Sequence, residues 1–384
     1  MVTSTEAASP TPLPTETPSA QAATSTPPGA SLPSGTAVPF PQDIQQVWMV
    51  DESNGWAADA ANRLFRTADG GESWYSVTVP GQYIARLSAF LDSTHVWLAD
   101  PQRGLWRTTD GGLTWTHLTD IGLPTKGVEP FYQFTSPNDG LVEVSGFGAG
   151  DRYNQLFETH DGGASFHAIS VVGPTNEMGL AEGVAQYCRL CGNALYYSSS
   201  RTVIVEGGLE KPPGTVRVRQ STDLGQHWSE SRLPLLAGYE DALVVALPLA
   251  FQSDGRGYLP IRLLKYNANG KAYDIVAIYT TSDGGTTWSL PTTVLSNAEP
   301  FMLNFNDLDV EVLCGGDLCI SHDGAQTWET ITPNVDFSYT DTHYVQEMTF
   351  LTPLSGWILM WESPATYELY RTDDGGATWT LLNH

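Results

Sequence analysis

The stretch Thr67-Ala-Asp69-Gly-Gly71-Glu-Ser73-Trp74 decides the fold, because seven versions of it occur along the chain. The shared pattern is Ser/Thr-x-Asp-x-Gly-x-Ser/Thr followed by Trp or Phe, with single departures in two copies. Successive aspartates lie 41, 51, 62, 60, 40 and 51 residues apart. Repeats of this length are typical of propellers, solenoids and arrays. The other copies begin at Thr108, Thr159, Ser221, Thr281, Ser321 and Thr372.

Each copy is predicted to be a hairpin turn, because strand-like segments precede and follow it, as at 63–66 and 75–79. Glycine supplies the positive φ of a tight turn, and the aspartate can accept hydrogen bonds from nearby backbone N–H groups. The final Trp or Phe can pack against a neighbouring sheet. Calcium or catalytic sites are the alternative, but each copy has one carboxylate where a calcium loop needs several.

The pattern resembles the Asp-box, or BNR, repeat over residues 42–384. Families with this repeat include sialidases, sortilin-type receptors, xyloglucan-degrading glycosidases and the photosystem II stability and assembly factors. The resemblance implies a β-propeller whose Asp boxes are structural and lie away from the ligand face. It therefore implies a structural role for Asp69, Asp110, Asp161, Asp223, Asp283, Asp323 and Asp374.

The spacing of the strand-like segments predicts an all-β fold, a seven-bladed β-propeller of four-stranded antiparallel blades over residues 40–384. Each repeat should join the third and fourth strands of a blade, with two strands upstream, as at 47–50 and 55–57. In the fifth unit, 246–251 is predicted as the first strand. The ring closes either by pairing of 40–44 with the last blade or by packing. If that segment closes it, deletion of 36–44 should lower the melting temperature markedly.

Residues 1–39 are predicted to be a disordered Pro/Ser/Thr-rich linker, since this composition cannot form a core. Such a segment resembles the stalk of a secreted bacterial domain, although no hydrophobic signal segment precedes it. We expect an extracytoplasmic protein, secreted or held by a lipid anchor upstream. No apolar run is long enough to span a bilayer.

The formal net charge of −25 is unsuited to nucleic acid or anionic membranes, whose phosphates attract basic surfaces. We therefore expect no nucleic-acid partner. Solubility is the simplest interpretation of the acidity.

The four cysteines form two close pairs, Cys188 with Cys191 and Cys314 with Cys319. A two-residue turn at 316–317 would place the second pair directly opposite each other, in a geometry suited to a cross-strand disulfide. A four-cysteine zinc site and free thiols are the alternatives. We predict disulfides and no metal site, because the pairs fall in different blades and an exported chain favours disulfides.

The repeats direct the search for a ligand to the opposite face, where links between blades and links between second and third strands converge. Its Tyr, Arg and acidic residues could bind carbohydrate or a protein strand, although a solvated rim is the simpler interpretation of any one of them. The candidate ligand-face residues are Arg86, Arg103, Arg152, Tyr153, Tyr239, Glu240, Asp241, Tyr339, Asp341, His343 and Tyr344.

Enzymatic activity is the main alternative to binding. Glycosidases use two carboxylates at a defined separation, but the loops contain too many acids to choose a pair. A sialidase would also need an arginine triad, and although the chain contains several arginines, the early Arg-Ile-Pro motif of that family is absent. No nucleophile-elbow, metalloprotease or phosphate-loop motif occurs. Catalytic residues therefore stay unassigned, and no cofactor is expected.

These observations favour an exported or surface-anchored, non-enzymatic propeller that binds a protein or glycan through its loop face. A glycoside hydrolase or polysaccharide lyase is the alternative, and a purely structural surface protein is the third class.

Overall fold

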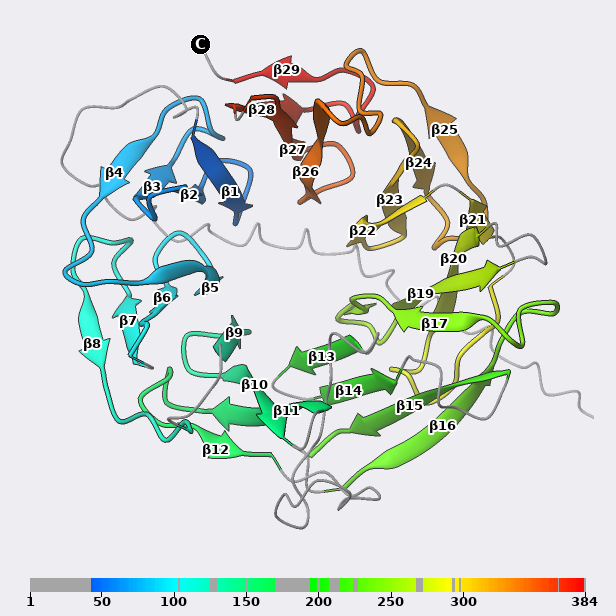
Figure 1. Cartoon of the computed structure of the whole chain (residues 1–384), viewed down its shortest axis with the longest axis horizontal. Helices are drawn as coiled ribbons and strands as arrows, with labels where there is room; N and C mark the ends of the chain where they lie inside the picture. Colours follow the sequence, from blue (N-terminus) through cyan, green and yellow to red (C-terminus); the bar gives the residue numbers. More distant parts are fainter. Residues whose placement is uncertain are drawn as a thin grey trace, which may run out of the picture.

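The chain folds as a ring of seven antiparallel sheets, a seven-bladed β-propeller, in a computed structural model (Figure 1). The predicted all-β architecture is confirmed, and no helix occurs among the described residues, so none crosses a membrane there. The predicted linker at 1–39 lies outside them. The structure describes residues 43–102, 104–124, 130–148, 151–169, 194–198, 201–206, 214–223, 227–266, 272–291, 294–296, 298–364 and 366–382.

Each blade runs outward from an inner strand beside the ring centre to an outer strand at the rim (Figure 1). Blades 1 to 3 comprise β1 (Ile44–Met49), β2 (Gly55–Asp59), β3 (Leu64–Thr67), β4 (Tyr75–Val77), β5 (Ile84–Phe90), β6 (Val96–Ala99), β7 (Leu105–Thr108), β8 (Thr116–Leu118), β9 (Pro130–Phe134), β10 (Gly140–Gly148), β11 (Asp151–Thr159) and β12 (His167–Ala168).

Blades 4 and 5 comprise β13 (Ala194–Ser198), β14 (Arg201–Glu206), β15 (Thr215–Ser221), β16 (Ser229–Pro234), β17 (Leu243–Ala246), β18 (Ala250–Phe251), β19 (Gly257–Tyr266), β20 (Ala272–Thr281) and β21 (Val294–Ser296). Blades 6 and 7 comprise β22 (Ala298–Asn306), β23 (Asp309–Cys314), β24 (Asp317–Ser321), β25 (Glu329–Ile331), β26 (His343–Phe350), β27 (Gly356–Glu362), β28 (Thr366–Thr372) and β29 (Thr380–Leu381).

Blade 5 departs from the prediction, because its inner strand is split into β17 and β18, which both pair with β19. The expected single strand at 246–251 was therefore wrong. Pro248 lies in the gap and has no N–H to donate to the ladder, so pairing stops there. The Leu247 amide still donates to the Pro260 carbonyl at 3.0 Å and keeps the two pieces aligned.

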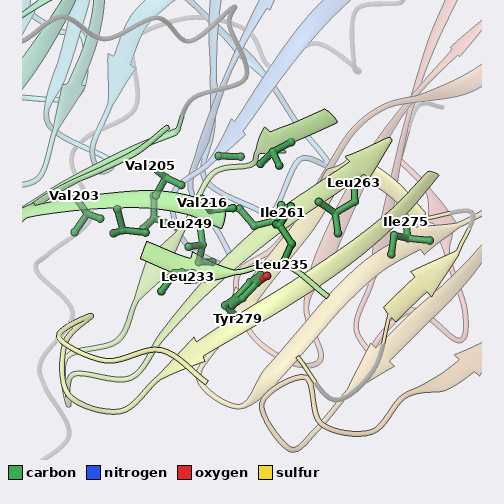
Figure 2. Close-up of a cluster of buried hydrophobic side chains, with 14 residues drawn as sticks. Val203, Val205, Val216, Leu233, Leu235, Leu249, Ile261, Leu263, Ile275 and Tyr279 are labelled. Atoms are coloured by element: carbon green, nitrogen blue, oxygen red, sulfur yellow. The ribbon is translucent and has the colours of Figure 1, made fainter. Parts of the chain in front are cut away.

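The core consists of hydrophobic seams between neighbouring blades. Figure 2 shows the seam between blades 4 and 5, where Val203 and Val205 of β14 lie in one cluster with Ile261 and Leu263 of β19. These four side chains are completely buried. Burial of apolar area at about 25 cal/mol per Å² makes such seams the main stabilising contribution of the ring.

Ring closure occurs by packing among the described residues. Ile44 pairs with Asp59 inside blade 1, so the predicted alternative of pairing onto the last blade was wrong for this residue. Residues 40–42 of that segment lie outside the described part. Blade 1 and blade 7 are adjacent in Figure 1, and their side chains form one buried cluster that includes Ile44 and Trp357. Two complete blades thus meet through apolar side chains.

Three hydrogen bonds complete the closing seam. The Trp357 indole N–H donates to the Gly70 carbonyl at 2.9 Å, and the Ser355 hydroxyl donates to Glu52 at 2.8 Å. The Val47 amide donates to Glu347 at 3.3 Å. Burial raises the pKa of Glu347 to about 7, and the bond from Val47 opposes this rise weakly.

Cys314 and Cys319 form a disulfide with a Cα–Cα distance of 5.9 Å. The predicted register was wrong, because Cys314 pairs with Asp317 and the turn lies at Gly315 and Gly316. Both glycines have positive φ, 63° and 106°, as a two-residue turn that matches the strand twist requires. The cysteines are therefore diagonal neighbours on one face of the hairpin.

Candidate functional site

The seven repeats form hydrogen-bonded turns between the third and fourth strands. In the first copy, the Thr67 hydroxyl donates to Asp69 at 2.8 Å and accepts the Gly71 amide at 3.0 Å. Asp69 also accepts the Ser73 amide at 2.9 Å, and the Trp74 indole donates to the Gly71 carbonyl at 2.9 Å. The carboxylate, the hydroxyl and the ring are thus all used inside the turn.

The pKa values of these aspartates agree with that role. Hydrogen bonds from the Thr287 side chain and backbone lower the pKa of Asp283 to about 2. For Asp69, burial alone would raise the pKa, but bonds from Ser73 and Thr67 together outweigh it and lower the pKa. The pKa is lowered in every copy: Asp69, Asp110, Asp161, Asp223, Asp283, Asp323 and Asp374.

Backbone hydrogen bonds place the repeats on one face of the ring. The Gly70 amide donates to the Ser53 carbonyl in the turn between β1 and β2 at 2.8 Å, and Gly375 donates likewise to Leu354 in blade 7 at 2.9 Å. We call this the repeat-turn face. Because the strands are antiparallel, the links between second and third strands and between blades lie at the other end, the loop face.

Replacing Asp69 with alanine should lower the free energy of unfolding by about 1–2 kcal/mol, since two hydrogen bonds of the turn are lost. The folded pKa of Asp69 is below its ordinary value, so this contribution is present at neutral pH and is lost as the pH falls through the acidic range. Urea unfolding at pH 7 and in acid measures both effects. Unchanged stability at pH 7 would show that the carboxylate is not structural.

A pocket of about 210 Å³ lies between blades 5 and 6 on the repeat-turn face. Its polar groups are largely occupied, because Arg256 forms ion pairs with Asp254 and Asp307 and the Tyr258 hydroxyl donates to the Asp307 carbonyl. Across the described part of the chain, no group of three or more His, Cys, Asp and Glu could hold a metal ion. The pocket is therefore not the candidate site.

An aromatic row on blade 7 is the most distinctive feature of the loop face. Tyr344 lies opposite Trp361 in the sheet, and Trp361 lies opposite Tyr367. The rings of Tyr344 and Trp361 stack with centroids 5.1 Å apart, and Tyr339 stacks on Tyr344 at 5.8 Å. Tyr339 is 71% exposed, whereas the other three are half-buried. The row thus ends in an open aromatic surface.

The chain segments that carry the row also contain acidic residues. Asp341 is exposed, and Glu362 lies 3.8 Å from the His343 ring nitrogen. The exposed Asp336 accepts hydrogen bonds from the Ser338 hydroxyl at 2.6 Å and amide at 3.0 Å, which lower its pKa. Asp336 and Asp341 therefore add negative charge to the exposed segment that carries Tyr339.

Three other predicted residues gather at the link between blades 4 and 5. Asp241 forms an ion pair with Lys265 at 2.7 Å, and the Lys265 ammonium also donates to the Gly238 carbonyl at 2.8 Å. Glu240 accepts the Gly238 amide at 3.0 Å, and the half-buried Tyr239 packs against the seam of blades 4 and 5. Each of these three side chains thus has a partner within the link or in blades 4 and 5.

The remaining predicted residues are dispersed or lie outside the described residues. Arg86 is exposed on the inner strand β5, and Arg152 and Tyr153 belong to β11 rather than to a loop. Tyr339, Asp341, His343 and Tyr344 form one segment on blade 7. Arg103, Cys188 and Cys191 lie outside the described residues.

Trp361 and Tyr367 are missing from the predicted candidates, although the sequence contains a signal for them. Gly356 pairs with Thr372 at the repeat-turn end of the hairpin, and residues equally distant from that pair face each other. Trp361 and Tyr367 are each five residues away. Counting strand register from the repeat would have placed both aromatics side by side.

No family model and no curated protein matches this chain. Solved structures are similar to it. YCF48 from Cyanidioschyzon merolae is 14% identical, with 88% of this chain and 98% of that chain covered and a TM-score of 0.50. A YCF48 structure bound to D1 peptide is 20% identical, with coverage of 88% and 96% and a TM-score of 0.49. A GH74 enzyme of Niastella koreensis is 18% identical, with coverage of 88% and 59% and a TM-score of 0.48. At these identities the likeness concerns the propeller fold alone.

Proposed function

We propose that this chain is a non-enzymatic binding propeller that recognises a protein segment or a glycan through its loop face. The observation that carries the proposal is the row of Tyr339, Tyr344, Trp361 and Tyr367 on blade 7. Tyr and Trp supply large contact areas at low entropic cost, and both occur often at binding hot spots. An aromatic surface that ends in a ring 71% exposed is suited to a ligand.

The paired carboxylates of the loop face support binding over catalysis. Asp241 is neutralised by Lys265, and Glu362 lies next to His343. Carboxylates held in internal pairs contribute to the shape and charge of a surface. A glycosidase instead needs two opposed carboxylates about 5–9.5 Å apart around a sugar. An assay of oligosaccharide cleavage tests the glycoside hydrolase alternative.

We further propose that the protein works outside the cytoplasm, secreted or held by a lipid anchor upstream. The Cys314–Cys319 disulfide supports this location, because disulfides persist in oxidising compartments. The net charge of −25 supports a partner other than nucleic acid.

A binding screen of the full chain tests the proposed function. The chain is applied to panels of immobilised peptides and oligosaccharides, and the same oligosaccharides are incubated with it and assayed for cleavage. We expect binding without turnover, and weaker binding for Tyr344→Ala, because this change removes the middle ring of the stack. Leu354→Ala, an exposed residue in the same blade on the repeat-turn face, is the control. Cleavage of any oligosaccharide would support the hydrolase or lyase instead.

A further inference from the structure

We propose that the stack of Tyr339, Tyr344 and Trp361 binds an arginine side chain of a basic peptide segment. The inference rests on the proposed function, in which the loop face binds a ligand, and it selects one chemical class of partner. Three features of the blade 7 surface carry it: an open ring face, a preorganised loop and exposed carboxylates.

The open ring face belongs to Tyr339. Its ring is inclined by 29° to that of Tyr344, and the Tyr344 ring is inclined by 26° to that of Trp361, so the three rings form a continuous stack. Tyr344 and Trp361 are half-buried, while Tyr339 at the end is 71% exposed. A planar group can therefore extend the stack at Tyr339. The arginine guanidinium is planar, stacks on aromatic faces and is weakly hydrated.

The loop that presents Tyr339 is preorganised. The Thr340 amide donates to the His343 carbonyl at 2.8 Å, and the Ser363 amide donates to the Thr342 carbonyl at 2.8 Å. Upstream, Phe337 is 1% exposed and packs edge-to-face on Trp379 at 5.4 Å. A loop already held in place loses little entropy when a ligand binds.

The charge around the stack selects a cation. Asp341 lies two residues from Tyr339, is exposed, and has no ion pair among the described residues. Asp336, in the same loop, is kept ionised by the hydrogen bonds from Ser338. Segments 334–344 and 361–367 contain no Lys or Arg. A neutral sugar could stack on Tyr339 but would gain nothing from these carboxylates, whereas a guanidinium can stack and pair with one.

Titration of the full chain with a peptide tests the inference. The probe is fluorescently labelled Gly-Arg-Gly-Arg-Gly with a blocked C-terminus, and the comparison peptides carry Lys or Glu in place of Arg. Anisotropy at low ionic strength should show binding of the Arg peptide, weaker binding of the Lys peptide and none of the Glu peptide. Tyr339→Ala should weaken Arg-peptide binding about fivefold, and Tyr339→Phe should retain it. Asp341→Asn should weaken it about threefold and reduce its dependence on salt.

Leu354→Ala and Glu72→Gln, exposed residues on the repeat-turn face, are the matched controls and should bind like the parent chain. Equal binding of the Arg and Lys peptides, or no effect of Tyr339→Ala, would overturn the assignment. Cellohexaose is titrated in parallel. Binding of cellohexaose that is lost in Tyr339→Ala, without binding of the Arg peptide, would overturn the inference and leave loop-face binding intact.

Discussion

Trp357→Ala is expected to lower the free energy of unfolding by about 3–5 kcal/mol, the usual loss for a buried Trp. The side chain is 2% exposed in the closing seam, and the Arg371 guanidinium carbon lies 5.4 Å from the ring centre. Its indole N–H also donates to Gly70 of blade 1. Among the described residues the propeller closes by packing, so loss of the indole weakens the seam between blades 1 and 7.

Trp361→Ala is the matched control for this prediction, because Trp361 lies on the same strand, β27, but is half-buried at the loop face. It should cost roughly 1–2 kcal/mol, in proportion to the smaller area buried. Denaturant unfolding of both variants measures the difference. Equal losses would contradict the role of Trp357 in closure.

Stability is also expected to fall as the pH rises, because blade 6 buries a carboxyl group. Glu311 of β23 is 1% exposed, and neither carboxylate oxygen has a hydrogen bond of normal geometry among the described residues. Burial raises its pKa to about 8, and Asp309 adds to the rise, while the Glu311 backbone amide, His322 and Asn306 oppose it. The folded chain thus holds this proton when the unfolded chain, with a pKa near 4.5, has lost it.

The direction of the pH dependence follows from the difference between the folded and unfolded pKa of Glu311. Between pH 4.5 and 8 the folded state binds more protons than the unfolded state, so the free energy of unfolding decreases as the pH rises. The slope is about 1.4 kcal/mol per pH unit, or on the order of 5 kcal/mol over the whole range. Glu347, with a pKa of about 7, contributes in the same direction over a shorter range.

Glu311→Gln should remove most of this dependence and stabilise the chain at pH 8, because the amide has no charge to bury. Thermal unfolding from pH 4.5 to 8 compares it with the parent and with Glu72→Gln, an exposed control. The double change Glu311→Gln with Glu347→Gln should flatten the profile further. A Glu311→Gln profile parallel to that of the parent would show that Glu311 is ionised without cost in the folded chain.

The blade architecture could be predicted from sequence because each repeat is a local turn. Glycine φ and the bonds of Asp69 with Thr67 and Ser73 depend on residues within one turn of the chain. Each turn then sets the register of its two flanking strands. Seven turns therefore imply seven blades without any knowledge of tertiary contacts.

Features that depend on contacts between blades were predicted less well. The closing seam joins residues about 300 positions apart, such as Ser355 and Glu52, and no local pattern reports such a contact. In blade 6, Val310 pairs with Ser321, the first residue of the repeat, and Glu311 comes next along β23. The same position is occupied by Trp56, Trp97 and Trp357 in blades 1, 2 and 7.

The candidate site was predicted in part. Tyr339 and Tyr344 could be identified as loop-face aromatics, but their stacking on Trp361 depends on strand register across β26 and β27. The register of the disulfide hairpin was also mispredicted. Two adjacent glycines with positive φ determine where that hairpin turns, so Cys314 lies opposite Asp317 and not opposite Cys319.

The two faces have separate roles in this proposal: the repeat carboxylates build the ring, and the loop face of blade 7 binds the ligand. Measuring affinity and melting temperature together in Tyr339→Ala and Asp69→Ala, with the tightest ligand of the binding screen, tests it most directly. Tyr339→Ala should lose affinity at an unchanged melting temperature, and Asp69→Ala should lose stability at an unchanged affinity. Loss of affinity in Asp69→Ala, with full binding by Tyr339→Ala, would contradict it.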